Sequence, residues 1–332
     1  MQRAYLPAVA NCAWLRLKLR AMEPSTQVGV KSRKSWAEEG ERGNRFALQV
    51  IAWIALHLGR RLSRAVLVPV VAYFYLSSPK ARRASAKFLS RIPGQGHGAG
   101  AVFRHLYTFA AVTLDRIYFL NGRLDLFDVK IKDDQNQALG TATRGIGMFL
   151  MGAHMGSFES VRSIARQHPD LRMVLLMYED NARNIKQLLS AINPQAQQHI
   201  IALGQPSAML QVRDQLKDGA LIGVLADRSL ESAGNVQVNF LGQDASFPLG
   251  PFRLAAMLKH PVFFMVGLYE GGNRYTIHLE SVMDFSTLGP AEREQASRAA
   301  LVRYVQLIER HCLNAPANWF NFFDFWPDDA PK

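Results

Sequence analysis

The chain has 332 residues, of which 48% are hydrophobic and 10% aromatic, so it can form a sizeable core and is not intrinsically disordered. Lysine and arginine number 39 against 27 acidic residues, which gives a formal net charge of +12. This balance predicts an anionic partner, such as a membrane face, an acidic carrier protein or nucleic acid. The two cysteines, Cys12 and Cys312, match no metal or redox spacing, which favours a reducing compartment.

The first 45 residues are expected to form a poorly ordered N-terminal extension. Proline, serine and glycine break any periodicity between residues 23 and 45. Residues 1–22 carry Arg16, Lys18 and Arg20 inside their apolar stretch, whereas a secretory signal needs an uninterrupted one.

Residues 46–93 are predicted to form a membrane-associated helical region. The apolar runs 46–58 and 65–76 are each about a dozen residues long, and a spanning helix needs about 20. We therefore expect two helices lying in one leaflet, with the intervening basic residues at the lipid phosphates. A pair of buried core helices in a soluble protein is the alternative. The basic residues concerned are Arg60, Arg61 and Arg64, extended by Lys80, Arg82, Arg83, Lys87 and Arg91.

Residues 100–326 predict one α/β domain, with a central mixed sheet flanked by helices. Short apolar segments alternate with amphipathic ones, which is the pattern of this fold class. The expected strands are 147–152, 172–178, 198–203, 220–226, 262–268 and 274–279. The expected helices are 157–167, with Ser157 as N-cap, 181–192, 206–217, 250–259 and 291–312.

A candidate catalytic pair lies in residues 152–159 (GAHMGSFE), where a predicted strand passes into a helix. Sites of α/β proteins gather at the carboxyl ends of strands. His154 and Glu159 would point apart on one regular helix, so they can meet only if His154 lies in the turn and Glu159 in the first helical turn. In that arrangement Glu159 would orient the imidazole, and His154 would act as general base on a hydroxyl.

The same spacing also fits two structural residues. A histidine at a strand end can simply be hydrogen-bonded, and a glutamate in a first turn complements the helix dipole. No metal site is expected, because two ligands are too few and the chain has no H-E-x-x-H motif. No cofactor is expected either.

Three further segments follow this pair in a fixed order. They are Asp227-Arg228 after a predicted strand, Phe247, Pro248 and Gly250 before a helix, and Pro261 before a strand. The ordered set resembles the four motif blocks of the glycerolipid and lysophospholipid acyltransferase superfamily. The chain looks most like a divergent branch of the bacterial lipid A biosynthesis acyltransferases, the lauroyl and myristoyl transferases, over about residues 45–326.

This resemblance implies direct transfer of a fatty acyl group from acyl carrier protein or coenzyme A to a hydroxyl of a lipid or glycolipid, without an acyl-enzyme. It also implies lipid A-type biosynthesis at a membrane surface, on the cytoplasmic face of the bacterial inner membrane. His154 and Glu159 would be catalytic. The expected substrate-binding residues are Asp227, Arg228, Phe247, Pro248, Gly250 and Arg253, with ordinary surface arginines as the alternative for Arg228 and Arg253.

Two segments depart from the pattern that the resemblance implies. Leu249 stands where phosphatidic-acid-forming members have a glutamate, which speaks against a glycerol-3-phosphate or lysophosphatidate acceptor. The ending at 318–326 (NWFNFFDFW) replaces the basic Trp-x-His-Arg-Arg-like string of the lipid A enzymes. Its aromatic residues indicate core packing, with an acyl-channel lining as the alternative. The residues expected on one helical face are Trp319, Phe322, Phe323 and Trp326.

Other interpretations are a phospholipid-remodelling lysophospholipid acyltransferase and a non-catalytic membrane-binding protein of the same fold. Nucleic acid is not an expected partner, because the basic residues lie beside apolar runs rather than among exposed stacking aromatics. Asp115 and Arg116 are expected to form an ion pair at a helix–helix contact, and His105 is expected to be structural.

Overall fold

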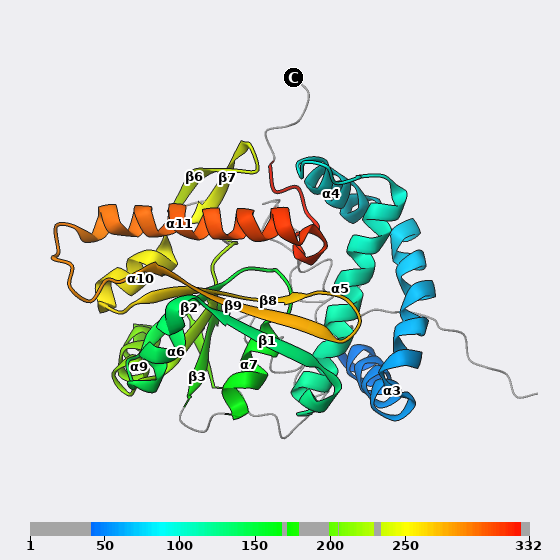
Figure 1. Ribbon diagram of the computed structural model, residues 1–332, viewed down its shortest axis with the longest axis horizontal. Helices are drawn as coiled ribbons and strands as arrows, with labels where there is room; N and C mark the ends of the chain where they lie inside the picture. The colour runs from blue at the N-terminus through cyan, green and yellow to red at the C-terminus, as the bar shows by residue number, and fades with distance from the viewer. Residues whose placement is uncertain (1–40, 168–170, 179–198, 205, 229–233, 327–332) are drawn as a thin grey trace, which may run out of the picture.

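A seven-stranded sheet forms the centre of the computed structural model, which describes residues 41–167, 171–178, 199–204, 206–228 and 234–326 (Figure 1). The strands are β1 Asp128–Asp133, β2 Met148–Gly152, β3 Met173–Tyr178, β4 Ile200–Leu203, β5 Leu221–Leu225, β8 Val262–Tyr269 and β9 Arg274–Met283. Their order is β1-β9-β8-β2-β5-β3-β4. The β8–β9 pair is antiparallel and the other neighbouring pairs are parallel, so the predicted mixed α/β fold is confirmed.

The central strands are apolar runs because both faces of the sheet are covered. Every residue of β2 is buried, as is nearly all of β8. Helices α6 Gln137–Thr143 and α7 Phe158–Gln167 pack on one face. Helices α10 Gly250–Leu258 and α11 Arg293–Asn314 cover the other (Figure 1). Helix α9 Pro206–Lys217 packs against β4 and β5.

A separate antiparallel hairpin, β6 Asn235–Phe240 and β7 Gln243–Pro248, was not predicted. Its two-residue turn, Leu241-Gly242, has positive φ at both positions, which is the backbone of a type I′ turn. Leucine is rare there, so the sequence lacks the usual Asn-Gly signal. Strand β1 was also missed. Predicted helix 181–192 lies outside the described residues.

The N-terminal region forms helices α3 Glu41–Ser77 and α4 Pro79–Ser90, which pack against the long helix α5 Ala99–Leu120 (Figure 1). Helix α3 is broken at Gly59, whose φ is +77°, between the two predicted apolar runs. Within the described residues no helix by itself has the length and apolar composition to cross a membrane. The segments Gly59–Ser77 and Pro79–Ser90 meet that criterion only together, across a 95° bend.

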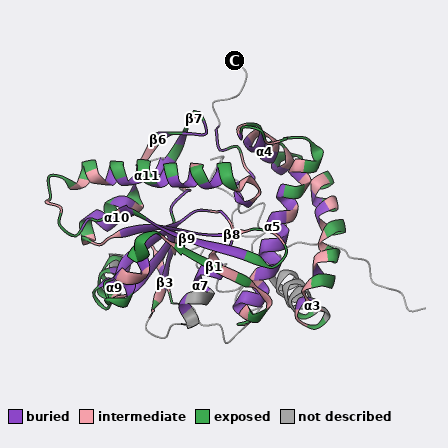
Figure 2. Ribbon diagram, viewed as in Figure 1, coloured by how far each residue is buried: buried purple, intermediate pink, exposed green. Residues whose placement is uncertain are grey.

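Several large apolar residues of α3 are exposed to solvent, and Figure 2 marks exposed residues along this helix. Leu62, Val66, Val68, Tyr73 and Leu76 are all exposed there. This surface is compatible with the predicted membrane association. The association itself and the domain boundaries at residues 45, 93 and 100 stay predictions.

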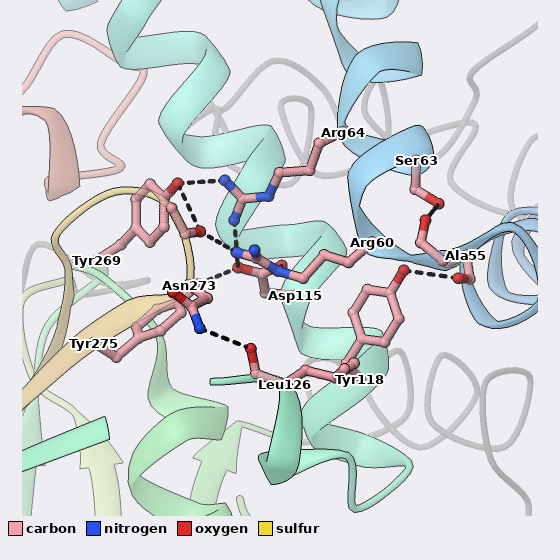
Figure 3. A network of polar contacts seen from close by, with 12 residues as sticks. Ala55, Arg60, Ser63, Arg64, Asp115, Tyr118, Leu126, Tyr269, Asn273 and Tyr275 are labelled. Carbon is pink, nitrogen blue, oxygen red and sulfur yellow. Dashed lines mark hydrogen bonds and ion pairs between the residues drawn. The ribbon is translucent and has the colours of Figure 1, made fainter. Parts of the chain in front are cut away.

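Arg60 and Arg64 point into the protein, so their predicted placement at lipid phosphates is wrong (Figure 3). Both arginines bind the carboxylate of Asp115 on α5, and Arg60 Nε lies 2.8 Å from Asp115 Oδ1. The Tyr275 hydroxyl donates to the same carboxylate at 2.7 Å, and Tyr269 contacts Arg64. We call these five residues the Asp115 cluster. Because it joins α3, α5 and β9, it fixes the N-terminal helices to the sheet.

The aromatic ending is not helical, contrary to the prediction, although its core packing is confirmed. After the short 3₁₀ helix η3 Pro316–Asn318, the chain runs extended and Trp319 forms a bridge with Met155. Trp319, Phe322 and Trp326 are buried, whereas Phe323 is half-buried. Phe240 of the hairpin packs against Trp319 and Trp326, so the ending joins the hairpin to the core.

Candidate active site

His154 lies in a tight turn between β2 and α7. At Gly156 the backbone φ is +57°, and a Cβ there would lie 2.1 Å from the carbonyl oxygen of Gly267 in β8. Only glycine fits such a position. Ser157 accepts a hydrogen bond from the Ser160 backbone at 3.2 Å, so the predicted N-cap is confirmed. The turn is therefore held against β8 on one side and continues directly into α7 on the other.

Asp227 is the carboxylate that meets the His154 ring. Strands β2 and β5 are parallel neighbours with Gly152 opposite Leu225, so the residues two positions beyond each strand end lie side by side. His154 Nδ1 is 2.7 Å from Asp227 Oδ1, and the His154 backbone N–H donates to Oδ2 at 3.0 Å. The Asp227 side chain is fully buried, whereas 30% of the imidazole remains exposed.

The charge state of Asp227 determines which ring nitrogen of His154 carries the proton. Burial alone would raise the pKa of Asp227, but the charge and hydrogen bonds of His154 and the charge of Arg228 outweigh burial and hold that pKa well below its usual range. The carboxylate is therefore ionised and accepts the Nδ1 proton. In the neutral ring the lone pair is then on Nε2.

Asn321 connects Asp227 to Arg228. Its side-chain Nδ2 donates to Asp227 Oδ2 at 3.2 Å, and its Oδ1 accepts from Arg228 Nε at 2.5 Å. Arg228 also donates to the Phe320 carbonyl at 3.1 Å and lies over the Phe323 ring. Burial lowers the pKa of Arg228 to about 10, against the opposing effect of Asp227, so the guanidinium remains charged at neutral pH.

The segment 318–321 runs beside the His154 turn. The Phe320 N–H donates to the His154 carbonyl at 2.7 Å, and the Gly156 N–H donates to the Asn318 carbonyl at 2.8 Å. The backbone on both sides of the imidazole is thus fixed by a segment whose aromatic residues were predicted to pack in the core or to line an acyl channel. Asn321 was missed as a site residue. Its one signal was that it occupies the place of the histidine in the Trp-x-His-Arg-Arg-like string.

A comparison with protein families shows which family the chain belongs to. A model described as bacterial lipid A biosynthesis acyltransferase matches residues 133–327, which is more than half of the sequence and includes His154, Asp227 and Asn321. The chain belongs to this acyltransferase family. The predicted resemblance is therefore confirmed for the family. A comparison with curated proteins finds no match.

Glu159, which was predicted to orient the imidazole, has arginine partners in the structure. Its Oε1 lies 2.7 Å from Arg116 of α5, and its Oε2 lies 2.9 Å from Arg162, one turn along α7. All three side chains are largely buried. Glu159 therefore joins α7 to α5, and Asp227 is the carboxylate bonded to Nδ1.

The predicted ion pair between Asp115 and Arg116 is wrong in its partners, although both residues do form ion pairs at helix contacts. Successive helical residues point about 100° apart, so the two side chains diverge. Asp115 faces α3 and binds Arg60 and Arg64, whereas Arg116 faces α7 and binds Glu159.

His105 has the structural role that was predicted. It is fully buried, with Nδ1 2.8 Å from Ser85 Oγ and Nε2 2.7 Å from the Trp319 carbonyl. Burial lowers the pKa of His105 to about 4; the hydrogen bond to Trp319 raises it and the charge of Arg104 lowers it. His105 thus links α4, α5 and the segment beside the active site.

The remaining predicted substrate-binding residues have other contacts. Phe247 is buried and packs against Phe240 and Phe325, and Pro248 is buried at the end of β7. Gly250 is exposed at the start of α10. Arg253 forms an ion pair with Glu294 of α11, and both side chains are about half exposed. Of the six predicted residues, Asp227 and Arg228 are the two that the structure brings to His154.

Proposed function

We propose that this protein transfers a fatty acyl group from an acyl carrier protein or coenzyme A thioester to a hydroxyl group of a lipid or glycolipid, in lipid A-type biosynthesis. His154 is the general base, and Asp227 is its orienting partner. The observation that carries the proposal is the 2.7 Å contact between His154 Nδ1 and the buried Asp227 carboxylate, at a ring that remains partly exposed. Membership of an acyltransferase family supplies the reaction type.

The proposed reaction begins at Nε2 of His154. Nε2 takes the proton from the acceptor hydroxyl as its oxygen attacks the thioester carbonyl carbon, and the C–O bond forms. The imidazolium is stabilised by the ionised Asp227, as in other histidine–carboxylate pairs. When the tetrahedral intermediate collapses, the C–S bond breaks and the thiolate takes the proton from Nε2. The cycle leaves His154 neutral and forms no covalent acyl-enzyme.

Arg228 is proposed to stabilise negative charge, either on the substrate or on Asp227. It is cationic at neutral pH, and its Nε and one Nη are engaged by Asn321 and the Phe320 carbonyl. These contacts fix the guanidinium beside the carboxylate. We assign Glu159 a structural role in this scheme, because both of its oxygens face arginines.

A location on the cytoplasmic face of the bacterial inner membrane is proposed on two grounds. The exposed apolar side of α3 supplies a surface that can enter a leaflet. The exposed basic residues Arg61, Lys80 and Arg83 lie on and after α3, where anionic headgroups would meet them. The net charge of +12 also suits an acidic carrier protein as donor.

The proposal is tested by incubating the purified full chain with acyl carrier protein or coenzyme A thioesters and a hydroxylated lipid A precursor in mixed micelles. Mass spectrometry should detect a product heavier by one acyl group, as an ester. His154→Ala should lose at least about 100-fold in kcat while its circular dichroism stays unchanged. His97→Ala, at an exposed loop position, is the matched control. A folded His154→Ala protein with normal turnover would refute the mechanism.

A further inference from the structure

A second polar cluster lies on the face of β9 that α11 covers. His278 and Glu280 are two residues apart on the strand, so both side chains stand on the same face of the sheet. His311, in the last turn of α11, lies against these side chains. Glu280 and His311 are buried and His278 is half-buried. The proposed acyl transfer uses none of the three residues.

The three side chains converge on one point. One ligand atom from each lies within 4.8 Å of the others. His311 Nε2 is 2.6 Å from Glu280 Oε1, and the rings of His278 and His311 lie 4.7 Å apart between centroids. The ring of Phe264 stacks on His311, with an angle of 17° between their planes, and so fixes its orientation.

We propose that His278, Glu280 and His311 form a binding site for a divalent transition-metal ion such as Zn²⁺. Two imidazole nitrogens and one carboxylate oxygen are a ligand set that zinc and non-haem iron use, with the remaining position left to water. Bonds of about 2.0–2.2 Å place tetrahedral ligand atoms about 3.3 Å apart. This value lies between the 2.6 Å that separates Glu280 Oε1 from His311 Nε2 and the 4.8 Å within which the three ligand atoms lie.

The two carboxylate oxygens of Glu280 have different partners. Arg310 pairs with Oε2, and Oε1 faces His311. A carboxylate that binds a metal through one oxygen is commonly hydrogen-bonded through the other. The positive charge of Arg310 nevertheless opposes a cation at this distance, so its removal should tighten metal binding.

A bound ion would connect β9 to the end of α11. The next elements along the chain are η3 and the segment 318–321, which bonds to His154 and Asp227. The metal would therefore anchor the helix from which the active-site segment departs. This role is structural and does not depend on the identity of the acyl donor or acceptor.

The test uses the full chain, purified in the presence of a chelator and then freed of it. Titration with Zn²⁺ by calorimetry should give one ion per chain and raise the melting temperature. Co²⁺ should give visible absorption bands typical of a low-coordinate nitrogen and oxygen site. His278→Gln should weaken Zn²⁺ binding at least about 10-fold, since a ligand is removed. Arg310→Gln should strengthen binding, and His97→Gln should leave it unchanged.

Two results would overturn the proposal. One is a folded wild-type chain that binds no Zn²⁺ or Co²⁺ at micromolar concentration. The other is a His278→Gln protein with wild-type affinity. His278 is only half-buried, so this variant is expected to fold, and its melting temperature in the chelator measures that directly. Acyl transfer by the wild type is assayed separately, so failure of the metal site and failure of the proposed function are distinguishable.

Discussion

Two buried aspartates illustrate how the same residue serves different purposes in this molecule. The side chains of Asp115 and Asp227 are both fully buried, and both carboxylates accept hydrogen bonds from basic side chains. Asp115 is surrounded by Arg60 and Arg64, whose side chains are 14% and 12% exposed, and by the Tyr275 hydroxyl. Asp227 faces His154, whose ring is 30% exposed.

The difference lies in whether the partner can release a proton. Burial alone would lower the pKa of Arg64, but Asp115 and Tyr269 outweigh it and raise that pKa, so the guanidinium cannot act as a base at neutral pH. A histidine side chain, unlike a guanidinium, can take up and release a proton near neutral pH. Burial and charge are thus shared by both regions, and a titratable, partly exposed partner is what makes the Asp227 region a candidate site.

The largest expected effect comes from neutralising, one at a time, the two carboxylates that could be the partner of His154. Asp227→Asn should reduce kcat by about 100- to 10,000-fold, and by no more than His154→Ala does, because an amide favours the wrong imidazole tautomer. Glu159→Gln should reduce stability, since two buried arginines lose their counter-charge, while the folded fraction keeps most of its kcat. The two variants are compared by their kcat from steady-state kinetics, corrected for the folded fraction measured by circular dichroism. The opposite ranking would restore Glu159 as the partner of His154.

The Asp115 cluster should contribute to stability rather than to catalysis. Asp115→Asn leaves Arg60 and Arg64 without a counter-charge, and breaking a buried ion pair on one side costs about 3–5 kcal/mol. Urea unfolding should record this loss, and the pH profile of kcat should keep its shape. Asp125→Asn, at an exposed position, serves as the control. A changed pH profile would mean that the two aspartates are coupled.

Removal of Asn321 should affect the site through Asp227. Asn321→Ala deletes a hydrogen bond to a charged group, worth about 1.5–3 kcal/mol, and should lower kcat about tenfold or more. Without this side chain, Asp227 and Arg228 lose the residue that joins them, so His154 is oriented less well. The KM should change little, because Asn321 acts through Asp227 rather than on the substrate. An unchanged kcat would contradict this positioning role.

His105 should make stability depend on pH without a change in mechanism. Its pKa is about 4 in the folded protein and near 6.5 in the unfolded chain, so the unfolded state binds more protons between these values. Stability is then fully present above pH 6.5 and falls toward pH 4, by up to about 1.4 kcal/mol per pH unit. Melting temperatures of wild type and His105→Gln across this range measure the effect, and parallel curves would contradict it.

The smallest expected effect concerns the exposed side of α3. Replacing Leu62 and Val66 together by serine should lower partitioning into anionic vesicles by roughly tenfold, as part of two apolar side chains is lost from the leaflet. Val302→Ser, at an exposed position on α11, is the control. Co-sedimentation measures the bound fraction. Equal binding of all three proteins would place membrane contact elsewhere.

The elements that the sequence predicted well are those whose pattern is local. Strands β2, β5 and β8 are continuous apolar runs because they are buried on both faces, and the N-cap at Ser157 depends on neighbours three residues away. His154 was found because a histidine after such a strand lies at the sheet edge. The hairpin β6–β7 was missed because its Leu-Gly turn lacks the usual residues.

The partners of His154 could not be predicted from local spacing. Asp227 is 73 residues away in sequence and is brought near by the pairing of β2 with β5, which depends on strand order. The nearby Glu159 was therefore predicted to be the partner of His154. In the structure, Glu159 instead pairs with Arg116 of α5. The inward direction of Arg60 and Arg64 likewise depends on Asp115, 55 and 51 residues away.

The position of Asn321 has a consequence for biosynthesis. The residue that bonds to Asp227 follows it by 94 positions, and a ribosome adds about 5–20 residues per second. Roughly 5–20 seconds therefore pass between synthesis of the catalytic turn with its aspartate and synthesis of the segment that completes them. During that interval the nascent chain contains His154 and Asp227 without their final surroundings. The candidate site is therefore completed only when translation has passed residue 321, long after the N-terminal helices have been made.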